Sequence, residues 1–255
     1  MWLMVYLRLI QTFLQAYWTV WFEFPRLNQA QKMAAIQTWS RQALSVMGVE
    51  LASESPNQKP VDGVAPTLWV ANHVSWLDIL VIQAIHPCVF VAKSEVVRWP
   101  VLGRLAQACG VIFVDRQSAS GVRQMVHQVI DVLNQGLCVA AFPEGTTSAG
   151  HTVGVFHANV FEAAIHHHLA VQPIALHYSD SRTACWCPQA AFVDDMGLIG
   201  SLHQIIQTGG IRASARMAEP LSAIGHSRRT LAHLSHQTVS AHLRVLQQSH
   251  ESCCQ

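Results

Sequence analysis

Residues 67–78 read TLWVANHVSWLD, an apolar run that passes directly into polar residues. A short, continuously apolar run is typical of a strand that is buried on both faces. From about residue 76 the pattern favours a helix. A buried strand followed at once by a helix predicts a β–α–β unit, and in such units the active residues lie beyond the carboxyl end of the strand.

The same pattern repeats along the chain. Four further apolar runs predict buried strands: CVFVA (88–92), GVIFV (110–114), LCVAAF (137–142) and VQPIAL (171–176). Helices are predicted at 76–85, 118–134 and 156–168. Beyond these, the pattern favours strands at 190–193 and 211–217 and helices at 197–208 and 227–247. Alternating strands and helices predict an α/β fold, with a largely parallel central sheet flanked by helices on both faces.

The N-terminal 22 residues, MWLMVYLRLIQTFLQAYWTVWF, contain one charged residue and many aromatic ones. Polar residues recur at three- and four-residue steps and form one stripe along a helix: Arg8, Gln11, Thr12, Gln15 and Thr19. Aromatic residues at both ends of such a helix favour the headgroup level of a membrane. The segment therefore predicts a membrane-associated helix that remains attached.

A second helix is predicted from Asn28, a plausible cap, to about Met47, and Pro25 separates it from the first. We expect residues 1–50 to form a membrane-docking helical hairpin and residues 51–255 to form the α/β domain. Residues 52–66 are predicted to be a linker or loop. The alternative is that both helices belong to the core of a soluble domain.

The composition excludes several classes of function. Charged residues make up 12% of the chain and the net charge is +1, so there is no basic field to hold nucleic acid. The chain lacks the G-x-S-x-G, G-x-x-x-x-G-K-[ST] and G-x-G-x-x-G motifs. It has 15 histidines, but no Cys or His pair has the spacing of a zinc site, so we expect no metal.

The polar residues after the first strand include His73 and Asp78, an H-x-x-x-x-D pattern. On one continuous helix these side chains would point in nearly opposite directions, so they meet only if His73 lies in the turn before the helix. There the carboxylate can fix the imidazole tautomer and leave the other ring nitrogen as a base. The alternative is structural, because Ser75-x-x-Asp78 is also the pattern of a capping box.

A second polar segment, FPEGTTS (142–148), follows the strand at 137–142. It would bring a carboxylate, flexible backbone and three hydroxyls to the same sheet edge as His73. An ordinary polar turn would explain its Gly and Ser but gives no reason for Glu144. The strand at 110–114 ends in Asp115-Arg116, and the alternative for Arg116 is a surface ion pair with Asp115.

Together, NHVSWLD, VAKSEVVRWPVLGRLAQACGVIFVDR, FPEGTTS and VQPIAL resemble, in order and spacing, the four blocks of the glycerolipid (lysophospholipid) acyltransferases, the 1-acylglycerol-3-phosphate acyltransferase family. The resemblance runs from about Trp39 to about residue 220. It implies that His73 is the general base and that Asp78 orients it. The implied substrate-binding residues are Arg116, Glu144, Gly145, Thr146 and Thr147, with Arg116 and the Glu-Gly pair near the phosphate of the acceptor.

The resemblance also implies the substrates. The acyl donor would be acyl-CoA or acyl-carrier protein, with no cofactor, no metal and no covalent acyl-enzyme. The expected acceptor is the free hydroxyl of 1-acyl-sn-glycerol-3-phosphate, which gives phosphatidate. We expect the protein at a membrane, on the cytoplasmic face of a bacterial inner membrane, with membrane lipids as partners.

Two positions depart from the family pattern. Thr147 stands where the third block often has Arg, and His157 stands roughly where a Lys often follows. Loss of both cations favours an alternative acceptor, a lyso-ornithine lipid or a lysophospholipid with a larger headgroup. Two other classes remain as alternatives: a non-catalytic membrane lipid-binding protein, and a hydrolase with Ser75 as nucleophile.

Overall fold

The computed structural model describes residues 2–54, 65–99, 102–115, 118–166, 168–193 and 195–251. The strands are β1 Val49–Glu54, β2 Leu68–Ala71, β3 Val89–Lys93, β4 Ile112–Val114, β5 Val139–Ala141, β6 Ala170–Asp180, β7 Ile211–Met217 and β8 Leu221–Ser222. The α-helices are α1 Trp2–Trp18, α2 Gln29–Val46, α3 Leu77–Ile85, α4 Leu102–Ala108, α5 Ala119–Asn134, α6 Phe161–His166, α7 Leu198–Thr208 and α8 Arg228–Glu251.

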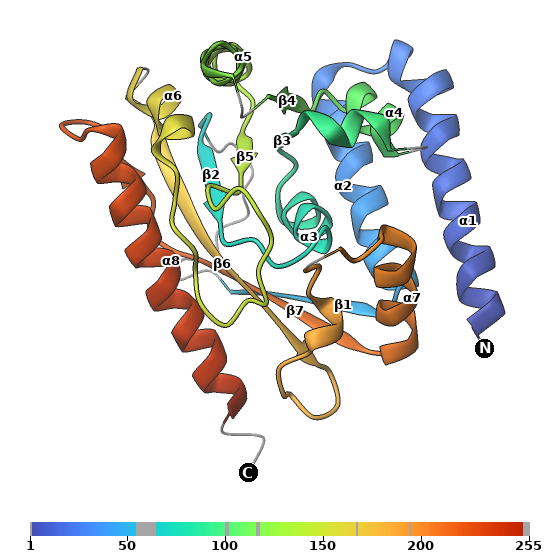
Figure 1. The fold of residues 1–255 in the computed structure, drawn as a ribbon. Helices are drawn as coiled ribbons and strands as arrows, with labels where there is room; N and C mark the ends of the chain where they lie inside the picture. Colours follow the sequence, from blue (N-terminus) through green and yellow to red (C-terminus); the bar gives the residue numbers. More distant parts are fainter. Residues whose placement is uncertain are drawn as a thin grey trace.

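The described strands form one sheet in the order β1, β7, β6, β2, β5, β3, β4, and β8 pairs with β6 (Figure 1). Neighbouring strands are parallel except where β6 pairs with β7 and with β8. In the middle of the sheet β2 lies between β5 and β6, with Leu68 opposite both Val139 and Val171. The largely parallel sheet confirms the predicted α/β fold class.

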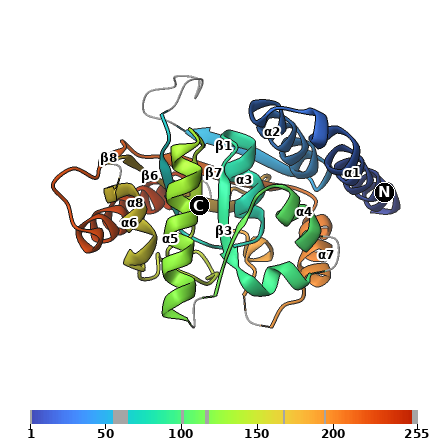
Figure 2. The same ribbon diagram turned by 90° about the horizontal axis from the view of Figure 1, so that it is seen from above.

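Helices cover both faces of the sheet. Helices α5, α6 and α8 lie on one face, and α2, α3 and α7 lie on the other (Figures 1 and 2). Alternate residues of β2 face the two helical layers. Leu68 and Val70 belong to the hydrophobic cluster that includes α5, α6 and α8, and Trp69 and Ala71 belong to the cluster that includes α3 and α7. Burial on both faces explains why the run is apolar throughout, without alternation.

The N-terminal helices form the predicted hairpin, in which α2 packs against α3 and β1 and α1 lies outside α2 (Figures 1 and 2). Asn28 caps α2 through a capping box with Gln31, as the sequence indicated. The indole of Trp39 in α2 donates to the carbonyl of Thr12 in α1, at 2.9 Å. Arg41 ties α2 to the body, because its Nε donates to the carbonyl of Ala84 at the end of α3, at 2.8 Å.

No α-helix in the described part of the chain is long and apolar enough to cross a membrane. The division of the chain at residue 50 into a docking pair and an α/β domain stays a prediction.

Several elements differ from the prediction. Residues 49–54 form β1, a strand parallel to β7, although residues 52–66 were predicted to be a linker. Glu50 and Arg212 form an ion pair across these two strands. β1 lies at the edge of the sheet, where polar residues are tolerated, so its sequence lacks the continuous apolar run of the central strands. Residues 190–193 are not a strand, because Pro188–Ala190 form a 3₁₀ turn. Helix α4 was not predicted.

Candidate active site

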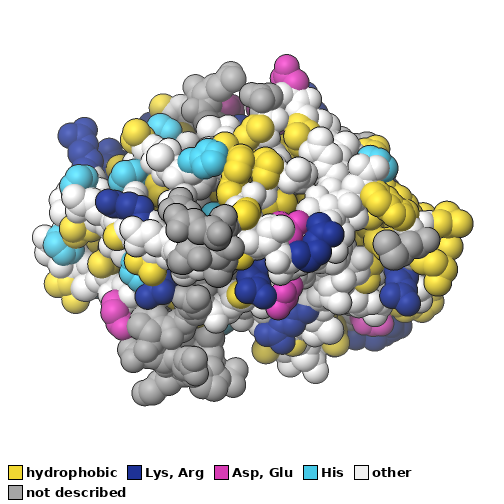
Figure 3. Space-filling model, turned by 90° about the horizontal axis from the view of Figure 1, so that it is seen from below, with side chains coloured by type: hydrophobic (Ala, Val, Ile, Leu, Met, Phe, Trp, Pro, Cys, Tyr) yellow, Lys and Arg dark blue, Asp and Glu magenta, His cyan; other side chains and the backbone are white. Residues whose placement is uncertain are grey.

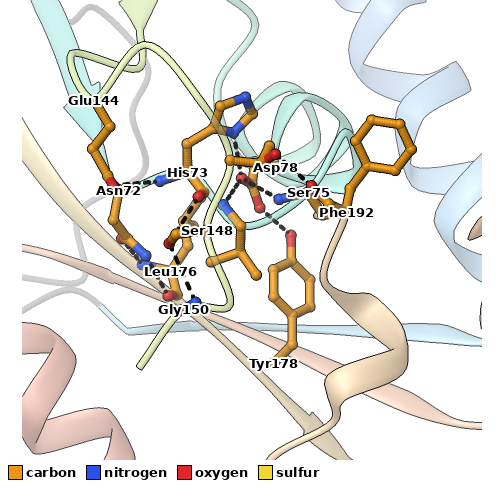
Figure 4. Close-up of polar contacts among 12 residues, drawn as sticks. Asn72, His73, Ser75, Asp78, Glu144, Ser148, Gly150, Leu176, Tyr178 and Phe192 are labelled. Carbon is orange, nitrogen blue, oxygen red and sulfur yellow. Dashed lines mark hydrogen bonds and ion pairs between the residues drawn. The ribbon is translucent and has the colours of Figure 1, made fainter. Parts of the chain in front are cut away.

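Two loops bring the predicted site residues together. The loop after β2 carries His73 and leads into α3, and the loop after β5 carries Glu144 through Ser148 (Figure 4). Because β2 and β5 are parallel neighbours, both loops leave the sheet at the same edge. The amide N–H of Ser148 donates to the carbonyl of His73, at 2.9 Å, and joins the two loops directly.

His73 and Asp78 meet as the sequence predicted. The distance from His73 Nδ1 to Asp78 Oδ2 is 2.8 Å (Figure 4). His73 lies in the turn before α3 and Asp78 lies in its first helical turn, the arrangement that the spacing required. The contact leaves Nε2 as the imidazole nitrogen without a hydrogen-bond partner among the described residues. An imidazole held in this way is suited to act as a general base.

Asp78 also fulfils the structural alternative. Its Oδ2 accepts from the amide N–H groups of Val74, at 2.7 Å, and Ser75, at 2.9 Å, and so closes the start of α3. The Ser75 hydroxyl makes no hydrogen bond, so only half of a capping box is present. Asp78 therefore both caps the helix and orients His73, and the two interpretations are compatible.

The position of His73 is fixed from three further directions. Its ring stacks on Phe142 with 4.0 Å between the centroids and 5° between the planes. Its amide N–H donates to Glu144 Oε1, at 2.8 Å. The neighbouring Asn72 exchanges two hydrogen bonds with the backbone of Leu176 on β6, at 2.8 and 2.9 Å. The imidazole is therefore held by elements on both sides of β2.

Glu144 is buried, and backbone groups occupy both of its carboxylate oxygens. Oε1 accepts from the N–H of His73 and Oε2 from the N–H of Gly154, at 2.9 Å. Burial raises the pKa of Glu144, although these two donors lower it. A Cβ at position 154 would lie 2.7 Å from Glu144 Oε2, so any residue larger than glycine there would displace this carboxylate oxygen. The carboxylate thus connects the two loops, and its predicted role in substrate binding stays a prediction.

A cavity of about 700 Å³ reaches His73 from the side of the N-terminal helices. Its wall is mostly apolar and is contributed by α1, α2, α3 and the segment from β3 to α4. Gly145, Thr146 and Thr147 line it near His73, as does the stacked Phe142. Gly145 has a left-handed backbone, with φ of +77°, which allows the turn of this loop. The Thr147 hydroxyl donates to the carbonyl of Phe192.

Arg116 lies outside the described residues. Among the described residues that line the cavity, Lys93 at the end of β3 is the one Lys or Arg. Sequence reasoning missed Lys93 as a site residue, although its place at the end of a predicted buried strand was a usable signal. It also missed Tyr178, whose hydroxyl donates to Asp78 Oδ1 at 2.6 Å, and which lies too far along the chain for any spacing rule.

In the part of the chain that the structure describes, no Ser, Thr or Cys side chain forms a hydrogen bond with the His73 ring. The Ser75 hydroxyl is fully buried and does not line the cavity, which argues against it as the nucleophile of a hydrolase. Within the described ranges, no group of three or more His, Cys, Asp or Glu side chains could hold a metal ion.

Comparisons with known proteins find acyltransferases. The model of the Acyltransferase family matches residues 52–177. The chain is 34% identical over 192 residues to a lyso-ornithine lipid O-acyltransferase of Pseudomonas aeruginosa, covering 75% of this chain and 70% of that protein. It is 36% identical over 175 residues to a 1-acyl-sn-glycerol-3-phosphate acyltransferase of Neisseria gonorrhoeae, covering 68% of this chain and 66% of that protein. The chain thus spans about two thirds of the length of these relatives.

The fold is also that of a solved structure. The crystal structure of the 1-acyl-sn-glycerophosphate (LPA) acyltransferase PlsC from Thermotoga maritima superposes with a TM-score of 0.65, over 95% of this chain and 97% of that one, at 17% identity. At this identity the likeness supports the fold alone. The relatives in sequence, with the paired His73 and Asp78 at the head of a cavity, identify the family: the chain belongs to the lysophospholipid acyltransferases.

Proposed function

We propose that the protein transfers a fatty acyl group from a thioester donor to the free hydroxyl of a lysolipid at a membrane surface. The observation that carries this proposal is the His73–Asp78 pair at the end of a large apolar cavity. Such a cavity suits an acyl chain, and the imidazole at its end suits proton removal from a hydroxyl.

In the proposed reaction, His73 Nε2 takes the proton of the lysolipid hydroxyl while its oxygen attacks the thioester carbonyl carbon. The carbon–sulfur bond then breaks, and the leaving thiolate receives the proton from the imidazolium. Asp78, already bound to Nδ1, stabilises the imidazolium between these steps. Acid–base catalysis of this kind contributes about 10²- to 10⁴-fold.

The negative oxygen of the intermediate needs hydrogen-bond donors. The amide N–H groups of Val74 and Ser75 already donate to Asp78, so they do not supply it. Thr146 and Thr147 line the cavity, and the described residues contain no acceptor for their amide N–H groups. We assign the oxyanion to this pair of amides.

For the acceptor, the first candidate is 1-acyl-sn-glycerol-3-phosphate, because Lys93 provides a cation for an anionic headgroup on the cavity wall. The second candidate is a lyso-ornithine lipid. It is favoured by Thr147, which stands where the family pattern often has Arg and whose hydroxyl donates to the carbonyl of Phe192. Acyl-CoA and acyl-carrier protein remain the two candidate donors.

Membrane contact is proposed from the outer face of α1. Large apolar residues on this face are exposed: Leu3, Leu7, Ile10, Leu14 and Trp18, followed by Trp21 in the π-helical turn Thr19–Glu23. Figure 3 shows hydrophobic side chains gathered at the edge of the molecule where α1 and α7 lie. Exposed apolar patches of this kind are typical of membrane or protein contact sites. We place the protein on the cytoplasmic face of a bacterial inner membrane.

The test is an acyl-transfer assay with labelled donors. The purified protein receives labelled acyl-CoA or acyl-carrier protein together with lysophosphatidate, lyso-ornithine lipid or lysophosphatidylcholine in vesicles, and the label is followed into diacyl lipid or free fatty acid. Transfer to a lysolipid that is lost in His73→Ala supports the proposal. Label released only to water would indicate a hydrolase, and no transfer to any acceptor would indicate a binding protein.

A further inference from the structure

We propose that Tyr178 is a positioning residue for the His73–Asp78 pair, whose hydroxyl holds the Asp78 carboxylate in the orientation that fixes His73. This inference rests on the proposed function for its kinetic consequences. Its structural basis is independent of that function. Tyr178 comes from β6, 100 residues along the chain from Asp78, and its ring is directed at the carboxylate (Figure 4).

The two oxygens of Asp78 have different partners. Oδ2 accepts three hydrogen bonds, from His73 Nδ1 and from the amides of Val74 and Ser75. Oδ1 accepts one, from Tyr178, and no other donor to this oxygen lies in the described part of the chain. Asp78 is 0% exposed and Tyr178 2% exposed, so water does not replace this contact. Removal of the hydroxyl would leave Oδ1 buried without a donor.

The fold fixes Tyr178 rigidly enough to set the orientation of the carboxylate. β2 ends at Ala71, opposite Ile174, and β6 continues past it to Asp180. Asn72 binds the backbone of Leu176, and Tyr178 follows two residues later on the same face of the strand. The backbone of Tyr178 pairs with Ala213 of β7, and its carbonyl accepts from the N–H of Cys187.

The hydroxyl can act here only as a donor, because an ionised carboxylate accepts hydrogen bonds and has none to give. Burial and the charge of Asp78 raise the pKa of Tyr178 well above its usual value, so the phenol stays protonated. Its donation spreads the negative charge of the carboxylate over both oxygens. Without it the negative charge concentrates on Oδ2, which then attracts the proton on His73 Nδ1 more strongly.

The first test is Tyr178→Phe in the full chain, which removes only the hydroxyl. We expect kcat to fall about 10-fold or more, with the KM of both substrates within about twofold, because the contact acts on the base and not on binding. The acidic limb of the pH profile of kcat/KM should move to higher pH. The matched control is Ile211→Val, a buried change in the same core, which should lower Tm and leave the pH profile in place.

A second readout needs no activity. The imidazole of His73 is titrated by NMR in the intact protein, with its signal assigned by comparison with His73→Ala, and its pKa should be higher in Tyr178→Phe. If the protein transfers no acyl group to any acceptor but this shift appears, the proposed function fails and the inference stands. An unchanged pKa of His73 in folded Tyr178→Phe would overturn the inference.

If Tyr178→Phe does not fold, 3-fluorotyrosine at position 178 keeps the ring and the hydroxyl and strengthens the donor. The pKa of His73 and the acidic limb should then move to lower pH than in the unaltered protein. If the acidic limb of the pH profile and the pKa of His73 stay unchanged or move to higher pH, Tyr178 has only a packing role.

Discussion

The two walls of the cavity are built in opposite ways. On the side of the sheet, the two carboxylates beside His73 are paired: Asp78 accepts four hydrogen bonds and Glu144 two. On the side of α1, the inner face packs through apolar residues such as Leu9 and Ala16, and the outer face is apolar and exposed.

The difference reflects what each wall has to do. Proton transfer needs donors and acceptors held within a fraction of an ångström, and the buried hydrogen bonds of the two carboxylates hold His73 in this way. A lipid chain has no polar groups to recognise along most of its length, so an apolar wall without specific pairing is sufficient. Changes on the sheet side should therefore act on turnover, and changes on the α1 side on access to lipid.

The largest effect is expected for His73→Ala. Acyl transfer should fall by about 10²- to 10⁴-fold, because the base is lost. Tm should change little, because Asp78 Oδ2 loses His73 Nδ1 but keeps the amide donors of Val74 and Ser75, and the backbone contacts of residue 73 survive. The measurement is transfer of labelled acyl groups together with a thermal melt. A stable variant that keeps full activity would contradict the role of His73 as the base, and with it the catalytic role of the sheet side.

Two substitutions at Asp78 distinguish its catalytic role from its role as a helix cap. In Asp78→Asn the amide oxygen can still accept from His73, Val74 and Ser75 while the NH₂ faces Tyr178, so the fold should survive but kcat should fall on the order of 10²-fold, because the charge is gone. Asp78→Ala should also lose the cap, about 0.5–2 kcal/mol of unfolding free energy. Urea unfolding and turnover are measured on both variants.

If Asp78→Asn lowers only the stability, with turnover per folded molecule unchanged, capping is the whole role of this residue.

Gly154→Ala tests the connection between the two loops. The new Cβ would lie 2.7 Å from Glu144 Oε2, so the carboxylate must shift. This shift would disturb the hydrogen bond that the amide of His73 donates to Oε1. We expect kcat to fall by about 10- to 100-fold, the range for a small misplacement of a catalytic group. The control is Gly200→Ala on α7, where nothing lies within 4 Å of the new Cβ. Equal activity of the two variants would contradict the role of Glu144 as a connector.

On the α1 side, Leu7→Glu with Leu14→Glu should weaken vesicle binding by about 10-fold or more, since burial of one Leu alone is worth about 1.5–3 kcal/mol. Activity on a short-chain, water-soluble acceptor should be retained. Val245→Glu makes the same kind of change at an exposed apolar residue of α8, on the other face of the sheet, and serves as the control. Co-sedimentation with anionic vesicles is the measurement. Deletion of α1 is a poorer test, because it would also expose core residues beneath Leu9 and Ala16.

Full vesicle binding by the Leu7 and Leu14 double variant would mean that another surface docks the protein.

The smallest effect is expected for Thr147→Arg, which adds a cation at the cavity and removes the hydroxyl bound to Phe192. The ratio of kcat/KM for lysophosphatidate to that for lysophosphatidylcholine should rise several-fold, because Arg binds phosphate through a bidentate fork. Thr147→Val removes the same hydroxyl without adding charge and is the matched control. A ranking that is the same in all three proteins would show that position 147 does not select the headgroup.

By itself the sequence determined the central strands and the meeting of His73 with Asp78, because continuous apolar runs and short-range spacing follow from local geometry. It also indicated the helical hairpin and the cap at Asn28. It did not determine β1 or the end of β6, because their residues are held by strand partners more than 150 and about 30 residues away in the chain.

Only the tertiary structure decided which groups each carboxylate binds. Tyr178 reaches Asp78 because β6 extends past the end of β2, and Glu144 faces the amides of His73 and Gly154 because a second loop folds back over the first. These contacts join segments 10 to 100 residues apart, and no pattern within one segment specifies them. They depend on the register of the sheet, which is set by the burial of the whole core.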